Sequence, residues 1–126
     1  MVIGDTFQLA GGHLWIAITA PDGLEGHFVV VNLTTLRPPT ADQTCVLHDG
    51  DHPFVHHDSV IQYSDAREWW IEGANGYDEH LNAGNVTPNQ HMSNVILRRV
   101  QDGALHSPYF AKKYLARVQA CLVAVG

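Results

Sequence analysis

The sequence predicts an α+β protein in which a small, strongly bent antiparallel β-barrel precedes two C-terminal helices. Three observations support this prediction. Short apolar segments separated by turn residues recur through residues 1–73, which is typical of strands joined by brief turns. Residues 86–123 change to the spacing of helices. Helices do not alternate with strands along the chain, which argues against a parallel βαβ layer structure.

The chain is expected to form one domain. Its 126 residues leave little room for a second hydrophobic core. The first residues lack a basic segment followed by an apolar stretch, and no run approaches the length of a membrane span, so we expect a soluble cytoplasmic protein. Cys45 and Cys121 lack the spacing of metal ligands, and we expect them to be small buried residues.

The strands are expected at residues 6–10, 13–20, 27–35, 43–48 and 59–63. The segment 27–35 is the clearest, because it is rich in β-branched and aromatic residues. Glycines 11 and 12 mark a tight turn, prolines 38 and 39 end the third strand, and Ser64 with Asp65 is expected to end the fifth. Residues 67–72 fit either a strand or one helical turn.

The helices are expected after a loop over residues 73–85. Thr87 and Pro88 have the pattern of an N-cap followed by proline at the first helical position, and Gly103 is expected to end this helix. Ser107 with Pro108 repeats the start signal. Apolar residues then recur at helical spacing on one face of each helix: Met92, Val95, Ile96 and Val100 in the first, and Phe110, Tyr114, Val118 and Cys121 or Leu122 in the second.

Charge is distributed unevenly along the chain. The net charge is −6, with −10 over residues 1–80 and +4 over residues 81–126. An acidic protein is a poor non-specific nucleic-acid binder, because phosphate neutralisation supplies most of such affinity. The basic helices are predicted to contact an acidic partner, through Arg98, Arg99, Lys112 and Lys113. Alternatively, these side chains are only solvated helix faces.

Residues 48–59 form the densest polar cluster, with four histidines and three acids. Imidazole and carboxylate groups are common metal ligands. However, Gly50 and Pro53 argue against a helix, so the spacing of the histidines does not place three of them on one face. We therefore predict no metal site here, and an exposed polar loop is the plainer interpretation.

A metal-free site is the remaining interpretation of this cluster. Histidine can act as a general acid or base near neutral pH. His52 is the best candidate, because Gly50 and Pro53 fix a tight turn around it, and Ser59 and Tyr63 follow shortly downstream. The sequence contains no glycine-rich phosphate loop, nucleophile elbow or dinucleotide-binding fingerprint.

Four segments of residues 4–67 resemble, in order, the PemK and MazF-like toxins of bacterial toxin–antitoxin systems. Gly4 and Asp5 resemble the opening of that family, and residues 13–19 resemble its second strand. Residues 30–35 resemble its third strand, which ends in two hydroxyl residues, and residues 57–63 resemble its segment with Asp-Ser-Val. The resemblance implies an SH3-like barrel.

The resemblance also implies metal-independent cleavage of single-stranded RNA, without a cofactor, by the ribose 2′-hydroxyl. His13 stands where the family has an arginine, and Thr35, with Thr34, stands at the position of its catalytic hydroxyl. On this basis His13, His52, Thr35, Ser59 and Tyr63 are the expected catalytic residues, and Thr34, Asp51 and Trp15 the expected substrate contacts.

Three functional hypotheses follow. The first is an endoribonuclease toxin with His13 and His52 as base and acid, paired with a cognate antitoxin protein. The second is a non-catalytic protein-binding module of phage or mobile-element origin. The third is a metal enzyme built on the histidines and aspartates. The family resemblance also implies a homodimer, whose interface would use Trp15 and the Trp69–Trp70 pair unless these side chains are buried in the core.

Overall fold

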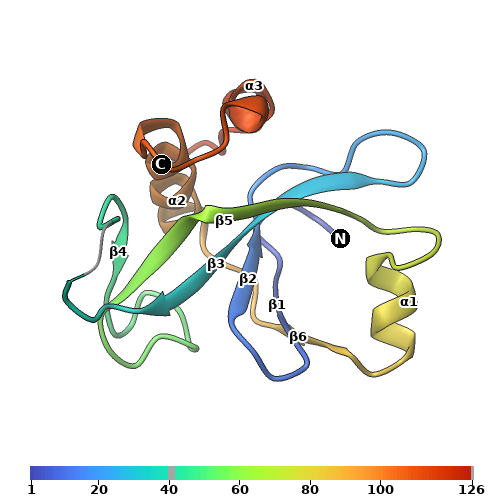
Figure 1. Ribbon diagram of the computed structural model, residues 1–126, viewed down its shortest axis with the longest axis horizontal. Coiled ribbons are helices and arrows are strands. Elements are labelled where there is room, and N and C mark those ends of the chain that lie inside the picture. Colours follow the sequence, from blue (N-terminus) through green and yellow to red (C-terminus); the bar gives the residue numbers. More distant parts are fainter. Residues whose placement is uncertain (40–41, 126) are drawn as a thin grey trace.

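The computed structural model describes residues 1–39 and 42–125 and contains one curled antiparallel sheet. Across these residues the sheet has six strands in the order β4-β5-β3-β2-β1-β6, and it curls into a half-barrel (Figure 1). The strands are β1 (Thr6–Leu9), β2 (Leu14–Ala17), β3 (His27–Thr35), β4 (Val46–Leu47), β5 (Ser59–Trp70) and β6 (Val86–Asn89). The predicted α+β class and bent antiparallel sheet are therefore confirmed.

Residues 28–31 of β3 are all apolar, as expected for a strand segment covered on both faces. Val29, Val31 and Leu33 point to a core shared with the C-terminal helices. Phe28 and Val30 point to a second, smaller core on the opposite face, as expected for side chains that alternate along a strand. The sheet therefore has a helix-covered face and a second face with its own aromatic cluster.

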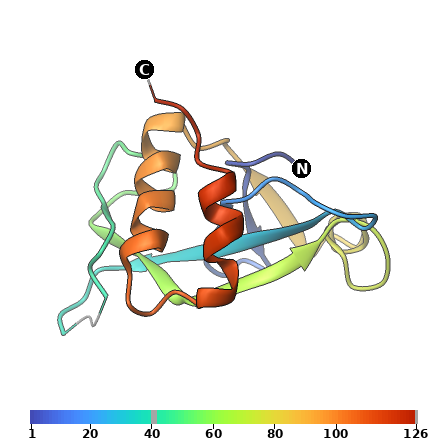
Figure 2. The ribbon, with the colours of Figure 1, turned by 90° about the horizontal axis from the view of Figure 1, so that it is seen from above.

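The helices are α1 (Tyr77–Asn82), α2 (Asn94–His106) and α3 (Leu115–Ala120), with a 3-10 turn η1 (Lys112–Tyr114) before α3. Figure 2 shows α2 and α3 side by side over the same face of the sheet. Gln101 fixes this layer: its buried amide donates to the carbonyl oxygens of Ile18 and Cys121, at 3.0 and 2.8 Å. Among the residues with described coordinates, no helix is long and apolar enough to span a bilayer.

The first C-terminal helix does not begin at Thr87 and Pro88, contrary to the sequence prediction. Residues 86–89 instead form β6, which pairs with β1 at the edge of the sheet, where a proline without an N–H is tolerated. The helix α2 begins at Asn94, and the Ser93 side chain caps it by accepting from the Ile96 amide. Val95, predicted on the apolar face, is consequently exposed.

Gly103 does not end α2 but lies inside it. The second start signal is also misplaced, because Ser107 caps the end of α2 and η1 begins only at Lys112. Phe110, Tyr114 and Val118 are buried as predicted, but only Val118 lies in the last helix, since Tyr114 belongs to η1 and Phe110 precedes it.

Four further predictions need correction. The expected loop at 73–85 contains the short helix α1. The expected break at Ser64 and Asp65 is absorbed by β5, which runs on to Trp70 with a register shift opposite residues 30–32 of β3. The strand expected at 43–48 is reduced to two residues. Cys45 is buried as expected, whereas Cys121 is only half-buried.

The Tyr63 side chain connects β5 to α2, and its burial makes the stability of the fold decrease at alkaline pH. Its hydroxyl donates to the Val100 carbonyl oxygen at 2.8 Å, and burial raises the pKa of Tyr63 far above its ordinary value of 10.0. The neutral hydroxyl thus stabilises the fold fully below about pH 10. This contribution is lost as the pH rises further, because the unfolded tyrosine then releases its proton while the folded one does not.

We expect Tyr63→Phe to lower the free energy of unfolding at pH 7 by about 1–2 kcal/mol, because the buried hydrogen bond from the Tyr63 hydroxyl to the Val100 carbonyl is lost. The difference from wild type should shrink above pH 10. Urea unfolding at pH 7 and pH 10.5 measures both effects, and Tyr109→Phe is the matched control, since Tyr109 is 48% exposed. A constant difference at the two pH values would contradict this account.

Candidate functional site

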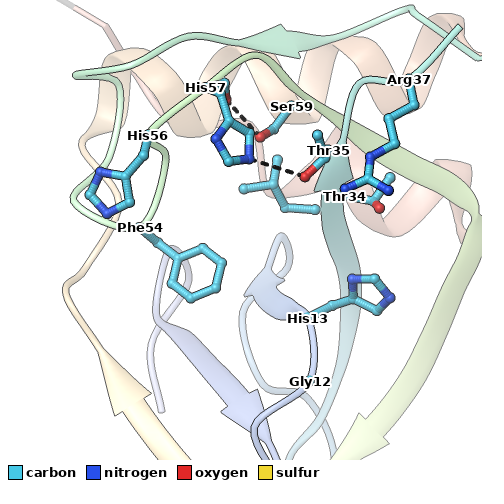
Figure 3. Close-up of a pocket in the computed structure, with 10 residues that line it drawn as sticks. Gly12, His13, Thr34, Thr35, Arg37, Phe54, His56, His57 and Ser59 are labelled. Carbon is cyan, nitrogen blue, oxygen red and sulfur yellow. Dashed lines mark hydrogen bonds between the residues drawn. The ribbon is translucent and has the colours of Figure 1, made fainter.

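The main candidate site is a cavity of about 450 Å³ at the end of β3, between the turn before β2 and the loop before β5. Figure 3 shows the side chains that line it. We call it the His57 pocket. Its lining residues are Gly12, His13, Leu33, Thr34, Thr35, Arg37, Phe54, His56, His57 and Ser59.

The charge of this lining differs from that of the surrounding chain. The lining that the structure describes contains three histidines and one arginine, and no aspartate or glutamate. Residues 1–80, which supply the whole lining, nevertheless carry a net charge of −10. The His57 pocket is therefore a local site of cationic and hydroxyl groups, which favours an anionic ligand such as a phosphate.

The pairing of β3 with β5 places a histidine beside a hydroxyl. Thr35 and Ser59 face each other in the register of the two strands. The Nε2 atom of His57 lies 3.2 Å from the Oγ1 atom of Thr35 (Figure 3), and the Ser59 hydroxyl donates to the His57 carbonyl oxygen at 2.9 Å. His57 is exposed, so its ring is both oriented and accessible.

The same strand pairing positions Arg37. Beyond the ends of the strands, the Leu36 amide donates to the Asp58 carbonyl oxygen at 2.9 Å, which holds the two chain segments together just before Arg37. Figure 3 shows the Arg37 side chain extending toward Thr34, with His13 and His57 on different sides of the pocket. A guanidinium in the same pocket as two imidazoles can hold a phosphate while the imidazoles transfer protons.

His13 is carried by the tight turn between β1 and β2. The Gly12 amide donates to the Leu9 carbonyl oxygen at 2.9 Å, and the Gln8 side chain donates to the Gly12 carbonyl oxygen at 3.0 Å. The structure thus brings four of the predicted site residues into one pocket: His13, Thr34, Thr35 and Ser59.

His52 does not line this pocket, although it was predicted to act with His13. It is 3% exposed. Its Nδ1 atom accepts from the Phe54 amide at 3.0 Å, and its Nε2 atom lies 2.6 Å from the Gln90 carbonyl oxygen. Both ring nitrogens are therefore used to hold the loop, which leaves His52 in a structural position.

Tyr63, Asp51 and Trp15 also lie outside the His57 pocket. Tyr63 is in the core beneath α2. Asp51 accepts from the His48 amide at 2.8 Å and pairs with Arg99 at 3.5 Å. Trp15 belongs to the smaller core on the second face of the sheet.

The four basic residues predicted to bind a partner lie in the helical layer. Arg98 pairs with Asp102 at 3.0 Å and donates to the Val123 carbonyl oxygen. Arg99 donates to the Val46 carbonyl oxygen at 2.8 Å. Lys112 and Lys113 lie on η1. The two arginines thus fix α2 to neighbouring segments.

Arg37, His56 and His57 were not assigned as site residues from the sequence. A signal for Arg37 was present, because it is one of only two bases in residues 1–80 and follows Thr34 and Thr35 directly. His57 was counted in the polar cluster, but its distance from Thr35 depends on the register of β3 and β5. In the part of the chain that the structure describes, no group of three or more histidines, cysteines and acids is placed to hold a metal ion.

Comparisons of this chain with protein-family models, with curated proteins and with solved structures find no match.

Proposed function

We propose that this protein is a metal-independent endoribonuclease that cleaves single-stranded RNA in the His57 pocket. The observation that carries the proposal is the composition of the pocket. Three histidines, one arginine and three hydroxyl residues line it without a carboxylate among the described lining residues, within the acidic part of the chain. These are the groups that phosphodiester cleavage by a neighbouring hydroxyl requires.

In the proposed reaction, one of His13 and His57 takes the proton of the ribose 2′-hydroxyl. The 2′-oxygen attacks the adjacent phosphorus, and the bond from phosphorus to the 5′-oxygen breaks. The other histidine gives its proton to that leaving oxygen, so that the products are a 2′,3′-cyclic phosphate and a free 5′-hydroxyl. Arg37 stabilises the charge on the phosphate oxygens, and Thr35 orients the His57 ring.

The position of Arg37 removes a difficulty in the family resemblance. His13 stands where the PemK and MazF-like toxins have an arginine, and histidine lacks the permanent charge and forked donors that suit a phosphate. Arg37 supplies a guanidinium to the same pocket from the end of β3. The resemblance supports an SH3-like barrel and a role as the toxin of a bacterial type II toxin–antitoxin system.

In this role the protein acts on cytoplasmic RNA and is neutralised by a cognate antitoxin protein. An acidic antitoxin segment would meet Arg98, Arg99, Lys112 and Lys113 on the helical layer. Because Arg98 and Arg99 already pair with Asp102 and Asp51, such a segment has to displace these carboxylates.

The proposal is tested by incubating purified protein with single-stranded RNA in the presence of EDTA and separating the products on a gel. We expect wild type to cleave the RNA and Arg37→Ala to cleave it about 100-fold more slowly, because one donor to the transition-state charge is lost. Lys112→Ala is the control, since it removes the same charge from η1, outside the pocket.

Intact RNA with wild-type protein would contradict the proposal. If the same RNA bound tightly without turnover, the non-catalytic binding module would replace it.

A further inference from the structure

A second cavity, of about 240 Å³, lies on the face of the sheet opposite α2. We call it the Trp15 cavity. Aromatic rings supply half of its eight described lining residues, namely Phe7, Trp15, Trp69 and His80. Arg67 and Glu68 are its charged lining residues, and both are exposed. The cavity is therefore apolar inside with charged groups at its rim.

The rings and the guanidinium of this cavity offer flat surfaces. The Cζ atom of Arg67 lies 5.0 Å from the centroid of the Trp15 ring. Trp15 itself is 6% exposed, so Arg67 is an exposed cation over a nearly buried ring. Aromatic faces and arginine planes are the groups on which nucleobases stack in proteins that bind single strands. The polar edge of a base is also compatible with Arg67 and Glu68 at the rim.

The Trp15 cavity and the His57 pocket lie along the same two strands. On β3, Val30 lines the cavity and Thr34 lines the pocket, and residues spaced by two and four share one face of a strand. Along β2, His13 lines the pocket just before the strand and Trp15 lines the cavity. Two residues of a strand span about 7 Å, so a strand of RNA in the pocket reaches the cavity with a neighbouring nucleotide.

Asn32 lies between the two sites, on the same face of β3 as Val30 and Thr34. It is 1% exposed, and its amide donates to Asp65 at 3.2 Å. Its Oδ1 atom has no hydrogen-bond partner among the described residues. Unpaired buried acceptors are rare in folded proteins, and this one places a polar atom beneath the part of the sheet that joins the two sites.

We propose that the Trp15 cavity is a subsite for a nucleobase next to the phosphate bound in the His57 pocket. The proposal rests on the proposed function for the identity of the substrate as single-stranded RNA. It gives Arg67 a specific role, which is to stack on the base from the solvent side. The continuity of the two sites along β2 and β3 and the exposed guanidinium of Arg67 over the Trp15 ring favour this occupant over a second copy of the chain.

The test uses a short fluorescent single-stranded RNA in which every 2′-hydroxyl is methylated, so that it binds without being cleaved. A second version lacks its bases. Fluorescence anisotropy at one fixed salt concentration gives the dissociation constants for wild type and Arg67→Ala. Lys113→Ala is the matched control, because its Nζ atom lies 5.2 Å from the centroid of the Tyr114 ring, a cation over a ring outside both sites. Circular dichroism checks the fold of each variant.

We expect Arg67→Ala to weaken binding of the complete RNA at least about fivefold, and binding of the abasic RNA by much less. Equal affinity of wild type and Arg67→Ala for the complete RNA would overturn the subsite, even where RNA cleavage is retained. Discrimination of the complete from the abasic RNA by a protein that cleaves no RNA would support the subsite and refute the proposed nuclease. A dimer in sedimentation velocity that Arg67→Ala dissociates, with no preference for bases, would assign the cavity to a second copy instead.

Discussion

Replacing His57 with alanine is expected to slow RNA cleavage by about 100- to 10,000-fold, the range typical for loss of a general acid or base. The expected effect is large because His57 is exposed to the pocket and is oriented by Thr35 at 3.2 Å. The fold should be unchanged, since the ring is exposed and the contact that closes this end of the sheet is made by its backbone carbonyl with Ser59. Single-turnover cleavage of a short RNA measures the rate.

Two further variants separate chemistry from positioning. The change His57→Gln keeps a side chain that can bond to Thr35 but cannot transfer a proton near neutral pH, so it should be as slow as His57→Ala. The control is His106→Ala, which changes an exposed histidine at the end of α2 and should leave the rate unchanged. A His57→Gln variant with wild-type activity would assign His57 a positioning role only.

The pH dependence of cleavage gives a second readout. In the proposed reaction one histidine must be neutral and the other protonated, so the wild-type rate should fall on both sides of a pH optimum. The residual activity of His57→Ala should lose one of these two limbs. The double variant with His13→Ala should be little slower than either single variant, because residues that act in one step are not additive.

The sequence was sufficient to predict the parts of the fold and site that depend on local patterns. The alternation and β-branched content of residues 27–35 predict β3, and glycines 11 and 12 predict the turn that carries His13. Because β2 and β3 are antiparallel neighbours, the start of β2 meets the end of β3. His13 and the hydroxyls of Thr34 and Thr35 were therefore correctly expected in one place.

The remaining site residues depend on contacts between distant segments. His52 looks exposed in its glycine and proline turn, but its partner is the Gln90 carbonyl, 38 residues away. Arg37 enters the pocket because Leu36 pairs with Asp58 beyond the strand ends. Nothing in the local sequence encodes either contact.

The two predicted helix boundaries, a start at Thr87 and Pro88 and an end at Gly103, are wrong for a related reason. The pair Thr87 and Pro88 is compatible with a helix start and equally with an edge strand, and pairing with β1 decides between them. Gly103 was interpreted as a helix end, because glycine favours that position. In the structure Gly103 lies inside α2, and its lack of a side chain allows α2 to approach the ring of Tyr63 closely.

The substitution Gly103→Ala is expected to lower the free energy of unfolding by at least about 2 kcal/mol. An added Cβ atom would lie 2.0 Å from the Tyr63 hydroxyl and 3.1 Å from the Cβ atom of Cys45. The hydroxyl cannot simply move away, because it donates to the Val100 carbonyl at 2.8 Å and the ring packs edge-on against Phe110. Urea unfolding at pH 7 measures the loss.

The sign of this effect is diagnostic. At an unconstrained helical position, glycine to alanine stabilises a protein by about 1 kcal/mol, so a gain in stability for Gly103→Ala would show that α2 is not held this closely to β5. The double variant Gly103→Ala with Tyr63→Phe should recover part of the loss, because the nearest clashing atom is removed, although the ring carbon Cζ remains 2.9 Å from the new Cβ atom. This recovery is a coupling that independent sites do not show.

The Tyr63→Phe variant also tests whether Tyr63 takes part in RNA cleavage. Tyr63 was predicted from the sequence to hold the scissile phosphate, whereas the structure buries it beneath α2. At a temperature where Tyr63→Phe is fully folded, its rate of RNA cleavage should therefore equal that of wild type. A loss of cleavage without a loss of folded protein would return Tyr63 to the catalytic site, and would require α2 to move away from β5 during the reaction.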